Sequence, residues 1–290
     1  MTIAASRFFS LPSEEITPEL EAAFFSDLKT GNATFKKTDA GRFAEIDRVL
    51  VREIAASCGA ETPVEVLDVG ISSGTTTLEL RDALAMAGID HRITATDQSF
   101  DARIVDGPFG SRALVEPSGH FLQFEIFGQP VRSWTRRLDR FTGRFLLTAA
   151  LRKLLTPAAQ RADSANDVRS VALVSPRLAN DDRVTLREDS ILEFNAELGN
   201  RFDVVRAANI LNLDYFSSAQ LQRGLDNVCR YLKGAGSLLL VIRTDKRTGI
   251  NNGSLFRLGE DGHLALVEQF GEGSEVAHLI PGRWFGKRAA

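Results

Sequence analysis

Cysteine is scarce in this 290-residue chain, which has only Cys58 and Cys229. The two cysteines form no metal-ligand pattern, so we expect no bound metal. A single disulfide between them is arithmetically possible. Isolated cysteines on helix-like segments are more typical of small buried hydrophobic side chains, and we favour that interpretation.

Long apolar runs are absent as well. No stretch approaches the eighteen uninterrupted apolar residues of a membrane span, and the opening MTIAASRFFSLPSEEIT has no basic start followed by an apolar core. We therefore expect neither a spanning helix nor a secretion signal, and a cytoplasmic location.

Charge of one sign is also lacking, because 35 basic and 38 acidic residues leave a net charge of −3. Such a chain has no general attraction for a polyanion, so nucleic acid is disfavoured as an obligate partner. Hydrophobic residues make up 43%, which is enough for one large core.

The pattern along the chain changes near residue 61. Residues 14–57 are expected to be helical, with Leu20, Phe24 and Leu28 on one face and a second helix over 39–56 capped by Thr38 or Asp39. We expect this helical segment, residues 1–60, to pack on or cap the core domain, residues 61–290. In that domain we expect strands over 64–69, 93–96, 184–186, 202–207 and 237–243, and helices over 75–87 and 219–232.

Strands that alternate with helices predict a mostly parallel sheet covered on both faces. Two segments depart from this pattern. Residues 254–258 and 264–270 flank the turn Glu260-Asp261-Gly262 and predict an antiparallel hairpin at one sheet edge. Residues 100–180, after the second strand, are too long for a simple connection and are interpreted as an inserted cap or subdomain.

The segment VEVLDVGISSGTTTLEL, residues 64–80, carries the strongest functional signal. A buried strand ends at Asp68, and a loop of small residues leads into a helix near Thr75. Small residues let a ligand approach the backbone, and the start of a helix favours an anionic group. The alternative is a structural strand-to-helix turn. The dinucleotide pattern G-x-G-x-x-G is met at Gly70 alone, since Ser72 and Thr75 stand at the other glycine positions.

Asp68, Gly70 and Gly74 instead resemble the first motif of class I S-adenosylmethionine-dependent methyltransferases, an acid followed by G-x-G-x-G, with Ser72 in place of the middle glycine. The resemblance implies a Rossmann-like, mostly parallel seven-stranded sheet. It also implies that this loop lies along the amino-acid portion of S-adenosylmethionine.

Three further elements extend the resemblance. In RITATDQS, Asp97 with Gln98 beside it is implied to hold the ribose hydroxyls, the alternative being an acid that caps a loop. In VTLREDSILEF, Asp189 and the Ser190 backbone are implied to meet the adenine, or else to cap a turn.

The fourth element, FDVVRAANILNLDYF, follows the strand that ends beside the sulfonium in this family. Ala207, Ala208 and Asn209 are expected to line the reaction centre. Asn209 and Tyr215 are the candidate catalytic residues, Asn209 orienting a polar group, although loop hydrogen bonding is an alternative for Asn209. Further candidates for a general base are Asp214, His120 and Glu125.

TATDQS and the segment from Val204 to Val241 also resemble, locally, the chemotaxis-receptor glutamate methyltransferases. Arg206 and Asn209 are separated by two alanines, so the adjacent arginine–asparagine pair of those enzymes is not reproduced.

Residues 131–161 combine apolar and basic side chains, with Trp134, Leu138, Phe141 and Phe145 at helical spacing. Three interpretations remain open for this stripe: docking on the protein body, capping an acceptor pocket with arginines that meet an anionic substrate, and lying on an anionic membrane surface.

Together these features predict a methyltransferase that uses S-adenosylmethionine and acts on a small-molecule or lipid-linked acceptor. The alternatives are a protein carboxyl methyltransferase, a non-catalytic S-adenosylmethionine-binding regulatory protein and, more weakly, a nicotinamide-dependent oxidoreductase.

Overall fold

The structure is a computed structural model that describes residues 3–31, 41–57, 62–135, 142–161, 168–245 and 247–280. The chain forms two compact units. We call Gly41–Ser99 with Asp181–Ala290 the parallel-sheet unit, and Met1–Ala40 with Phe100–Asn180 the antiparallel-sheet unit. The expected N-terminal segment 1–60 is thus divided between them. Its proposed capping role stays a prediction.

The parallel-sheet unit contains a seven-stranded sheet in the order β12-β11-β10-β9-β1-β2-β8. Neighbouring strands from β10 to β8 run parallel, while β11 and β12 are antiparallel. The Rossmann-like fold class expected from the sequence is confirmed. The strands are β1 (Val64–Val69), β2 (His91–Asp97), β8 (Val184–Glu188), β9 (Val204–Ala208), β10 (Leu238–Thr244), β11 (Asn251–Leu258) and β12 (Leu264–Phe270).

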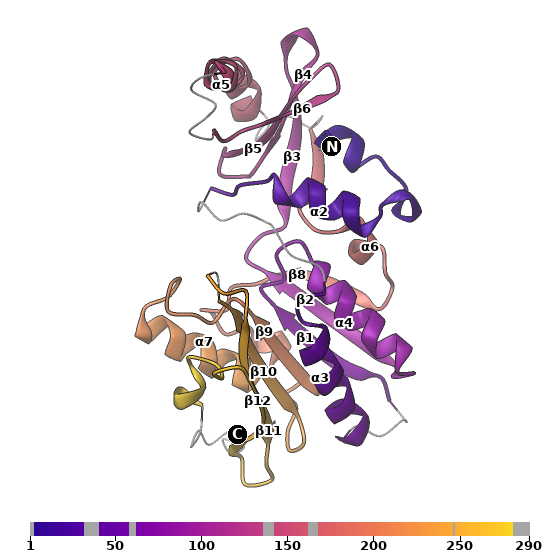
Figure 1. The fold of residues 1–290 in the computed structure, drawn as a ribbon, viewed down its shortest axis with the longest axis vertical. Coiled ribbons are helices and arrows are strands. Elements are labelled where there is room, and N and C mark those ends of the chain that lie inside the picture. Colours follow the sequence, from indigo (N-terminus) through magenta and orange to yellow (C-terminus); the bar gives the residue numbers. More distant parts are fainter. Residues whose placement is uncertain are drawn as a thin grey trace. The chain divides into compact units, whose positions relative to one another are not determined.

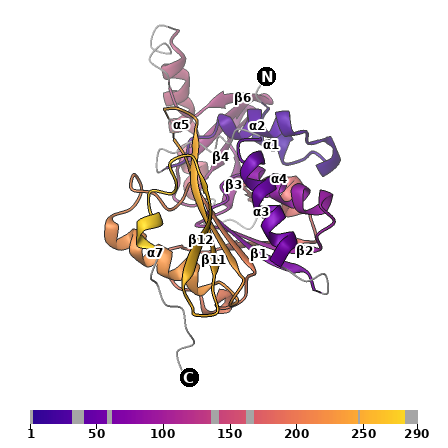
Figure 2. The same ribbon diagram turned by 60° about the horizontal axis from the view of Figure 1, so that its bottom comes forward.

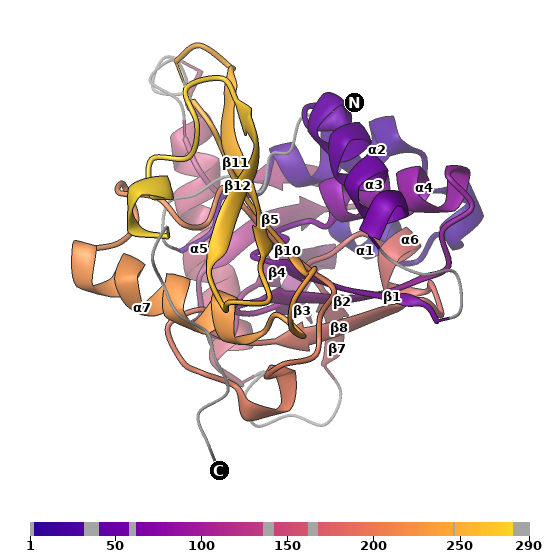
Figure 3. The same ribbon diagram turned by 90° about the horizontal axis from the view of Figure 1, so that it is seen from below.

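Helices cover both faces of this sheet (Figures 1 and 3). On one face, Leu221 and Leu225 of α7 (Ser218–Arg230) pack in a core with Leu67 and Val69 of β1. On the other face lie α3 (Ala44–Ser57) and α4 (Thr75–Met86). Burial on both sides explains why β1, β9 and β10 are nearly continuous apolar runs rather than alternating ones.

The C-terminal hairpin of β11 and β12 forms as predicted (Figure 2), and β11 also pairs with β10. Gly262 adopts a positive φ of 77° in the turn between β11 and β12, and the Asp261 side chain accepts a hydrogen bond from the His263 amide. This turn chemistry reverses the chain and leaves β12 as the edge strand.

The antiparallel-sheet unit is built on a five-stranded sheet in the order β6-β5-β4-β3-β7. Phe8 of α1 and Phe24 and Phe25 of α2 pack with one group of its core residues, and Leu151 and Leu155 of α5 pack with another. Residues before position 41 therefore complete the core of the 100–180 insertion. The elements are α1 (Ala5–Phe8), α2 (Pro18–Ser26), β3 (Asp101–Asp106), β4 (Ser111–Val115), β5 (Phe121–Ile126), β6 (Gln129–Arg132), α5 (Arg144–Arg161), β7 (Arg169–Ala172) and α6 (Pro176–Ala179).

The helical stripe expected from Trp134 to Phe145 is wrong at its start. Trp134 follows strand β6, and its indole Nε1 donates to the Asp27 carbonyl at 2.9 Å. Helix α5 begins at Arg144, after Gly143 in a left-handed conformation with φ 68°. Val131 and Arg132, which open the 131–161 segment, thus pair with β5 as part of strand β6.

Some expectations fall outside the described residues, namely Thr38, Asp39, Cys58, Leu138 and Phe141. Cys229 is buried without a disulfide, and burial raises the pKa of its thiol to about 12. Across the described part of the chain, no helix is both long and apolar enough to cross a membrane.

Candidate functional site

The order of the parallel strands creates a switch point beside β1. From β1 the chain proceeds outward on one side through β2 and β8, and it later returns to the other side of β1 to form β9 and β10. In open sheets of this kind, ligands bind at the carboxyl ends of the strands where the order reverses. The residues expected to hold the cofactor stand at or directly after these strand ends.

The loop after β1 has an unusual backbone. Gly70, Ser72 and Gly74 all have positive φ, of 74°, 57° and 79°. Ser72 is the position where the family motif has glycine, and it adopts the left-handed conformation that favours glycine. Gly74 is the N-cap of α4, which begins at Thr75 as predicted.

Asp97 ties this loop to the end of β2. Its Oδ2 accepts a hydrogen bond from the Ser72 amide at 2.6 Å, and its Oδ1 accepts one from the Gln98 amide at 2.7 Å. The Gly70 and Ile71 amides both donate to the Thr96 carbonyl. The structure therefore brings Asp97 and Gln98 together with Gly70 and Ser72, and the Ser72–Asp97 hydrogen bond spans 25 positions of the sequence.

Ile210 makes the close approach at Gly70. A Cβ at Gly70 would lie 2.5 Å from the Ile210 Cδ1 atom. The absence of a side chain at Gly70 thus makes room for Ile210 in the loop after β9. The sequence analysis expected the small residues of this loop to make room for a ligand. The sequence did not single out Ile210.

Asp68 is 2% exposed and lies in a buried ionic network. Its carboxylate accepts hydrogen bonds from Arg206 Nε at 3.0 Å, Arg206 Nη2 at 2.6 Å and the Thr77 hydroxyl at 2.7 Å. Arg206, fully buried on β9, also donates from Nη1 to Asp47 Oδ1 at 3.1 Å. Asp68 is therefore occupied by protein groups that join β1, β9, α3 and α4.

The network contains two carboxyl groups and one guanidinium, so Asp47 adds a second acidic group to the Arg206–Asp68 pair. Burial raises the pKa of Asp47 to about 6; the Arg206 charge opposes that shift and the Asp68 charge adds to it. The second oxygen, Oδ2, is buried without a hydrogen-bond partner among the described residues. A buried carboxylate with one unsatisfied oxygen costs stability when it is ionised.

Asp189 and Ser190 follow β8. The Asp189 amide donates to the Asp97 carbonyl at 2.9 Å, which places Asp189 beside the end of β2. Its side chain accepts from Asn195 Nδ2 at 3.2 Å, and partial burial raises the pKa of the Asp189 carboxyl. The Ser190 hydroxyl accepts a hydrogen bond from the Leu192 amide at 3.4 Å.

The end of β9 is held from the side of β10. Ala207 is fully buried in the core beneath α7. Asn209 has a positive φ of 61°, and its side-chain oxygen accepts from the Thr244 amide at 2.7 Å. Tyr215 lies farther along the loop and is 48% exposed.

Arg243 and Glu275 anchor this loop, and the sequence reasoning missed both. Arg243 Nη2 pairs with Asp214 Oδ2 at 2.6 Å, and Arg243 also pairs with Glu275. Glu275 accepts from the Leu213 amide at 2.8 Å. Asp214 is thus an ion-pair partner in the structure.

His120 and Glu125 belong to the antiparallel-sheet unit. His120 Nε2 is 3.0 Å from the Lys29 carbonyl oxygen. Glu125 is buried and accepts from the Ser6 hydroxyl at 2.6 Å. Both side chains connect the N-terminal segment to the five-stranded sheet.

Comparisons with known proteins place the chain among solved structures only at low similarity. A scan against protein-family models and a search of curated proteins each find no match. The CMeT domain of the citrinin polyketide synthase is 13% identical with a TM-score of 0.36, over 71% of this chain and 36% of that one.

Two further solved structures resemble the chain. An amino pentose methyltransferase from Micromonospora echinaspora is 14% identical with a TM-score of 0.32, over 77% of this chain and 66% of that one. The cyclase SpnF is 15% identical with a TM-score of 0.31, over 70% of this chain and 47% of that one.

Proposed function

We propose that the chain is an S-adenosylmethionine-dependent methyltransferase with a small-molecule or lipid-linked acceptor. The observation that carries the proposal is the placement of Asp97. Its carboxylate stands at the carboxyl end of β2, beside the switch point, and is held by the Ser72 and Gln98 amides.

The residues at this edge fit the nucleoside part of the cofactor. Each carboxylate oxygen of Asp97 accepts one backbone hydrogen bond, and a carboxylate oxygen has capacity for a second. Two ribose hydroxyls can therefore donate to the same side chain. Asp189, hydrogen-bonded through its amide to the Asp97 carbonyl, would meet the adenine with the Ser190 backbone.

The start of α4 suits the amino-acid part. Gly74 caps this twelve-residue helix without a side-chain hydrogen bond. The first-turn amides of a helix have no intrahelical acceptor, and they attract a carboxylate through hydrogen bonds and the helix dipole. Gly70 and Ser72 would shape the loop, and Asp68 would position it through Arg206 and Thr77 rather than by touching the cofactor.

The bound cofactor would supply the activated methyl group, so the protein mainly has to place the acceptor and exclude water. Ala207 lies in β9 and Asn209 directly follows this strand, whose end we expect to be nearest the transfer. The Asn209 oxygen is used by Thr244, so its side-chain NH2 is the group that would orient the acceptor. Tyr215 would act as general base if the acceptor is a hydroxyl or an amine.

Arg206 does not favour a protein carboxylate as the acceptor. Arg206 and Asn209 do not reproduce the arginine–asparagine pair of the chemotaxis-receptor enzymes, and Arg206 is fully buried between two aspartates. A binding protein without catalysis is the alternative that the same cofactor contacts allow. We also propose that the chain is cytoplasmic and contacts a membrane peripherally through the segment that contains α5.

Asp97→Ala tests the cofactor assignment by isothermal titration calorimetry with S-adenosylmethionine. Loss of two charge-assisted hydrogen bonds is expected to weaken binding by about 1 to 3 kcal/mol. Glu268→Gln is the matched control, because Glu268 is 43% exposed on β12 at the opposite edge of the sheet.

Equal affinity in wild type and Asp97→Ala would remove Asp97 from the site, and tighter binding of NAD than of S-adenosylmethionine would overturn the cofactor. Release of S-adenosylhomocysteine with candidate acceptors then separates an enzyme from a binding protein. Only the enzyme turns over.

A further inference from the structure

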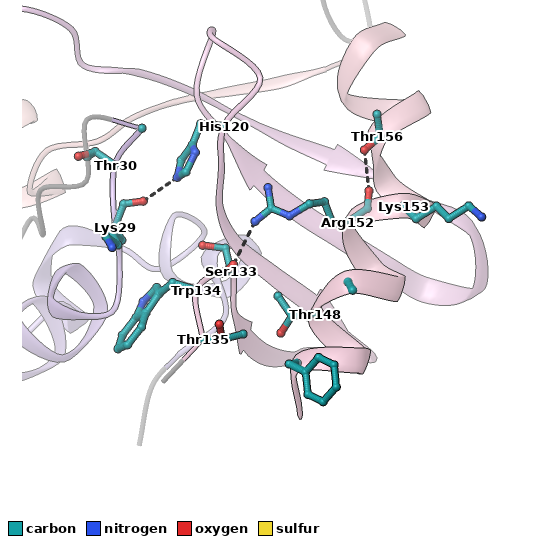
Figure 4. A pocket seen from close by; sticks show the side chains of 13 residues that line it. Lys29, Thr30, His120, Ser133, Trp134, Thr135, Thr148, Arg152, Lys153 and Thr156 are labelled. Atoms are coloured by element: carbon teal, nitrogen blue, oxygen red, sulfur yellow. Dashed lines mark hydrogen bonds between the residues drawn. The ribbon is translucent and has the colours of Figure 1, made fainter. Parts of the chain in front are cut away.

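A pocket lies entirely within the antiparallel-sheet unit. It is a pocket of about 780 Å³ between α5, residues 133–135 and residues 29–31, with His120 at its wall (Figure 4). All of these residues belong to one compact unit. The strand ends proposed to hold the cofactor belong to the parallel-sheet unit.

The charged side chains in the described lining of this pocket are basic. Lys29, Arg152 and Lys153 line it together with His120, and the described lining includes no aspartate or glutamate. Glu116 lies close by, where it accepts hydrogen bonds from the Gly31 amide at 3.0 Å and the Ser118 hydroxyl at 3.5 Å, but it is not part of the lining. Three cationic side chains around one hollow favour an anionic ligand.

Arg152 is held in place at the pocket wall. Its Nη2 donates to the Ser133 carbonyl at 3.1 Å, and its guanidinium carbon lies 5.5 Å from the centroid of the Phe121 ring. A guanidinium carries five N–H donors in a rigid fork, and the Ser133 bond uses one of them. A positioned fork of this kind matches a phosphate or carboxylate group.

Aromatic rings contribute the apolar part of the same wall. Trp134 is fixed by its hydrogen bond to the Asp27 carbonyl, and Phe145 is 40% exposed at the start of α5. An indole face and a phenyl ring give a flat group a surface to stack on. The pocket therefore combines anion recognition with space for a ring or chain.

The geometry points to a binding site for an organic phosphate, with Arg152 taking the phosphate, Trp134 and Phe145 taking the organic group, and Lys153 adding positive charge from the next position of α5. This inference is independent of the proposed methyl transfer. Phosphate esters of this class occur both as soluble molecules and as lipid headgroups, and both share the recognised chemistry.

Calorimetric titration of the full chain with phenyl phosphate tests the inference, with benzyl alcohol as the uncharged comparison. We expect phenyl phosphate to bind at least tenfold more tightly than benzyl alcohol. Arg152→Gln is expected to lower phenyl phosphate affinity at least tenfold. Arg161→Gln is the matched control on the same helix, since Arg161 does not line the pocket and bonds to the Pro157 carbonyl.

Lys153→Gln provides a second variant at an exposed position, should Arg152→Gln fail to fold by circular dichroism. It is expected to weaken binding at least threefold. Equal binding of phenyl phosphate and benzyl alcohol, no binding of either, or equal losses in the lining variants and Arg161→Gln would each overturn the site.

A parallel titration with dihexanoyl phosphatidic acid, below its micelle concentration, identifies the source of the ligand. Tighter binding of the lipid than of phenyl phosphate by tenfold or more supports the site with a lipid headgroup as its ligand. The reverse order supports the site with a soluble ester.

Discussion

At the scale of single residues, the buried charge of Arg206 has the largest structural consequence. It sits on β9, paired in register with Asp68 of β1, and it also reaches Asp47 on α3. The sequence carried a signal for this network, because an arginine inside a buried apolar strand needs an acidic partner. Which acids would serve depended on the register of β1 with β9.

Arg206→Met is expected to destabilise the chain by about 3 to 5 kcal/mol, because it leaves Asp47 and Asp68 buried without their counter-charge. Urea denaturation measures the loss. The triple variant with Asp47→Asn and Asp68→Asn should recover a large part of it, since no buried charge then remains. Equal losses in the single and triple variants would show that packing, and not charge, sets the cost.

The raised pKa of Asp47 predicts a specific pH dependence. The pKa of Asp47 is about 6 in the folded chain, against 3.8 for an aspartate that is not buried. Between these two pH values the folded state therefore holds a proton that the unfolded state releases. The stability contributed by this group is full below about pH 4 and is lost as the pH rises through about 6.

Asp47→Asn removes this titration. The free energy of unfolding of the variant relative to wild type is therefore expected to rise by about 2 kcal/mol between pH 4 and pH 7. Glu45→Gln on the same helix, at a side chain 81% exposed, is the control and should show no such trend. A difference between Asp47→Asn and wild type that is flat with pH contradicts the assignment.

At the scale of elements, the sequence predicted the parallel-sheet unit well. Strands buried on both faces are recognisable in the sequence as short apolar runs, and helix α7 is recognisable by apolar residues at helical spacing. The strands of the insertion were missed. Strands β3, β4 and β5 are joined by turns that contain Gly107 and Gly119, but neither turn has the two-residue form that signals a hairpin most clearly.

Helix α7 begins with a capping box. The Ser217 hydroxyl accepts from the Gln220 amide at 3.4 Å, and the Gln220 side chain accepts from the Ser217 amide at 3.0 Å. Ser217→Ala is expected to cost about 1 kcal/mol in urea denaturation. Ser218→Ala, one residue inside the helix, should be nearly neutral, and an equal cost at both positions would argue against the cap.

At the scale of the whole molecule, the sequence did not predict that residues 1–40 belong to the same unit as the 100–180 insertion. Residues 1–40 join the insertion through contacts between distant positions, such as the Ala5 amide with the Gln123 side chain at 2.7 Å. Local patterns do not encode such pairings. For the same reason the sequence placed Asp97 and Ser72 in separate motifs without predicting their hydrogen bond, and it gave no indication of Ile210 or Arg243.

Contact between residues 131–161 and an anionic membrane remains a prediction. Helix α5 exposes Phe145, Leu146 and Leu147 at its start, and its sequence contains arginine and lysine but no acid. Apolar side chains beside basic ones favour an anionic lipid surface. We expect the chain to float with phosphatidylglycerol vesicles at low salt and less at high salt.

Leu146→Glu should reduce this flotation, because Leu146 is 61% exposed and would bring a negative charge to the lipid surface. Met86→Glu on α4 is the control, at a side chain 90% exposed in the parallel-sheet unit. Unchanged flotation in Leu146→Glu would exclude α5 as the contact.

The central claim is that the strand ends around Asp97 hold the nucleoside of S-adenosylmethionine. A crystal structure of the chain with S-adenosylhomocysteine tests it most directly. We predict ribose hydroxyls within hydrogen-bond distance of the Asp97 carboxylate and the ligand carboxylate near the start of α4. Binding of the nucleoside elsewhere, or Ile210 and the loop after β9 filling this place in the presence of saturating ligand, would contradict the account.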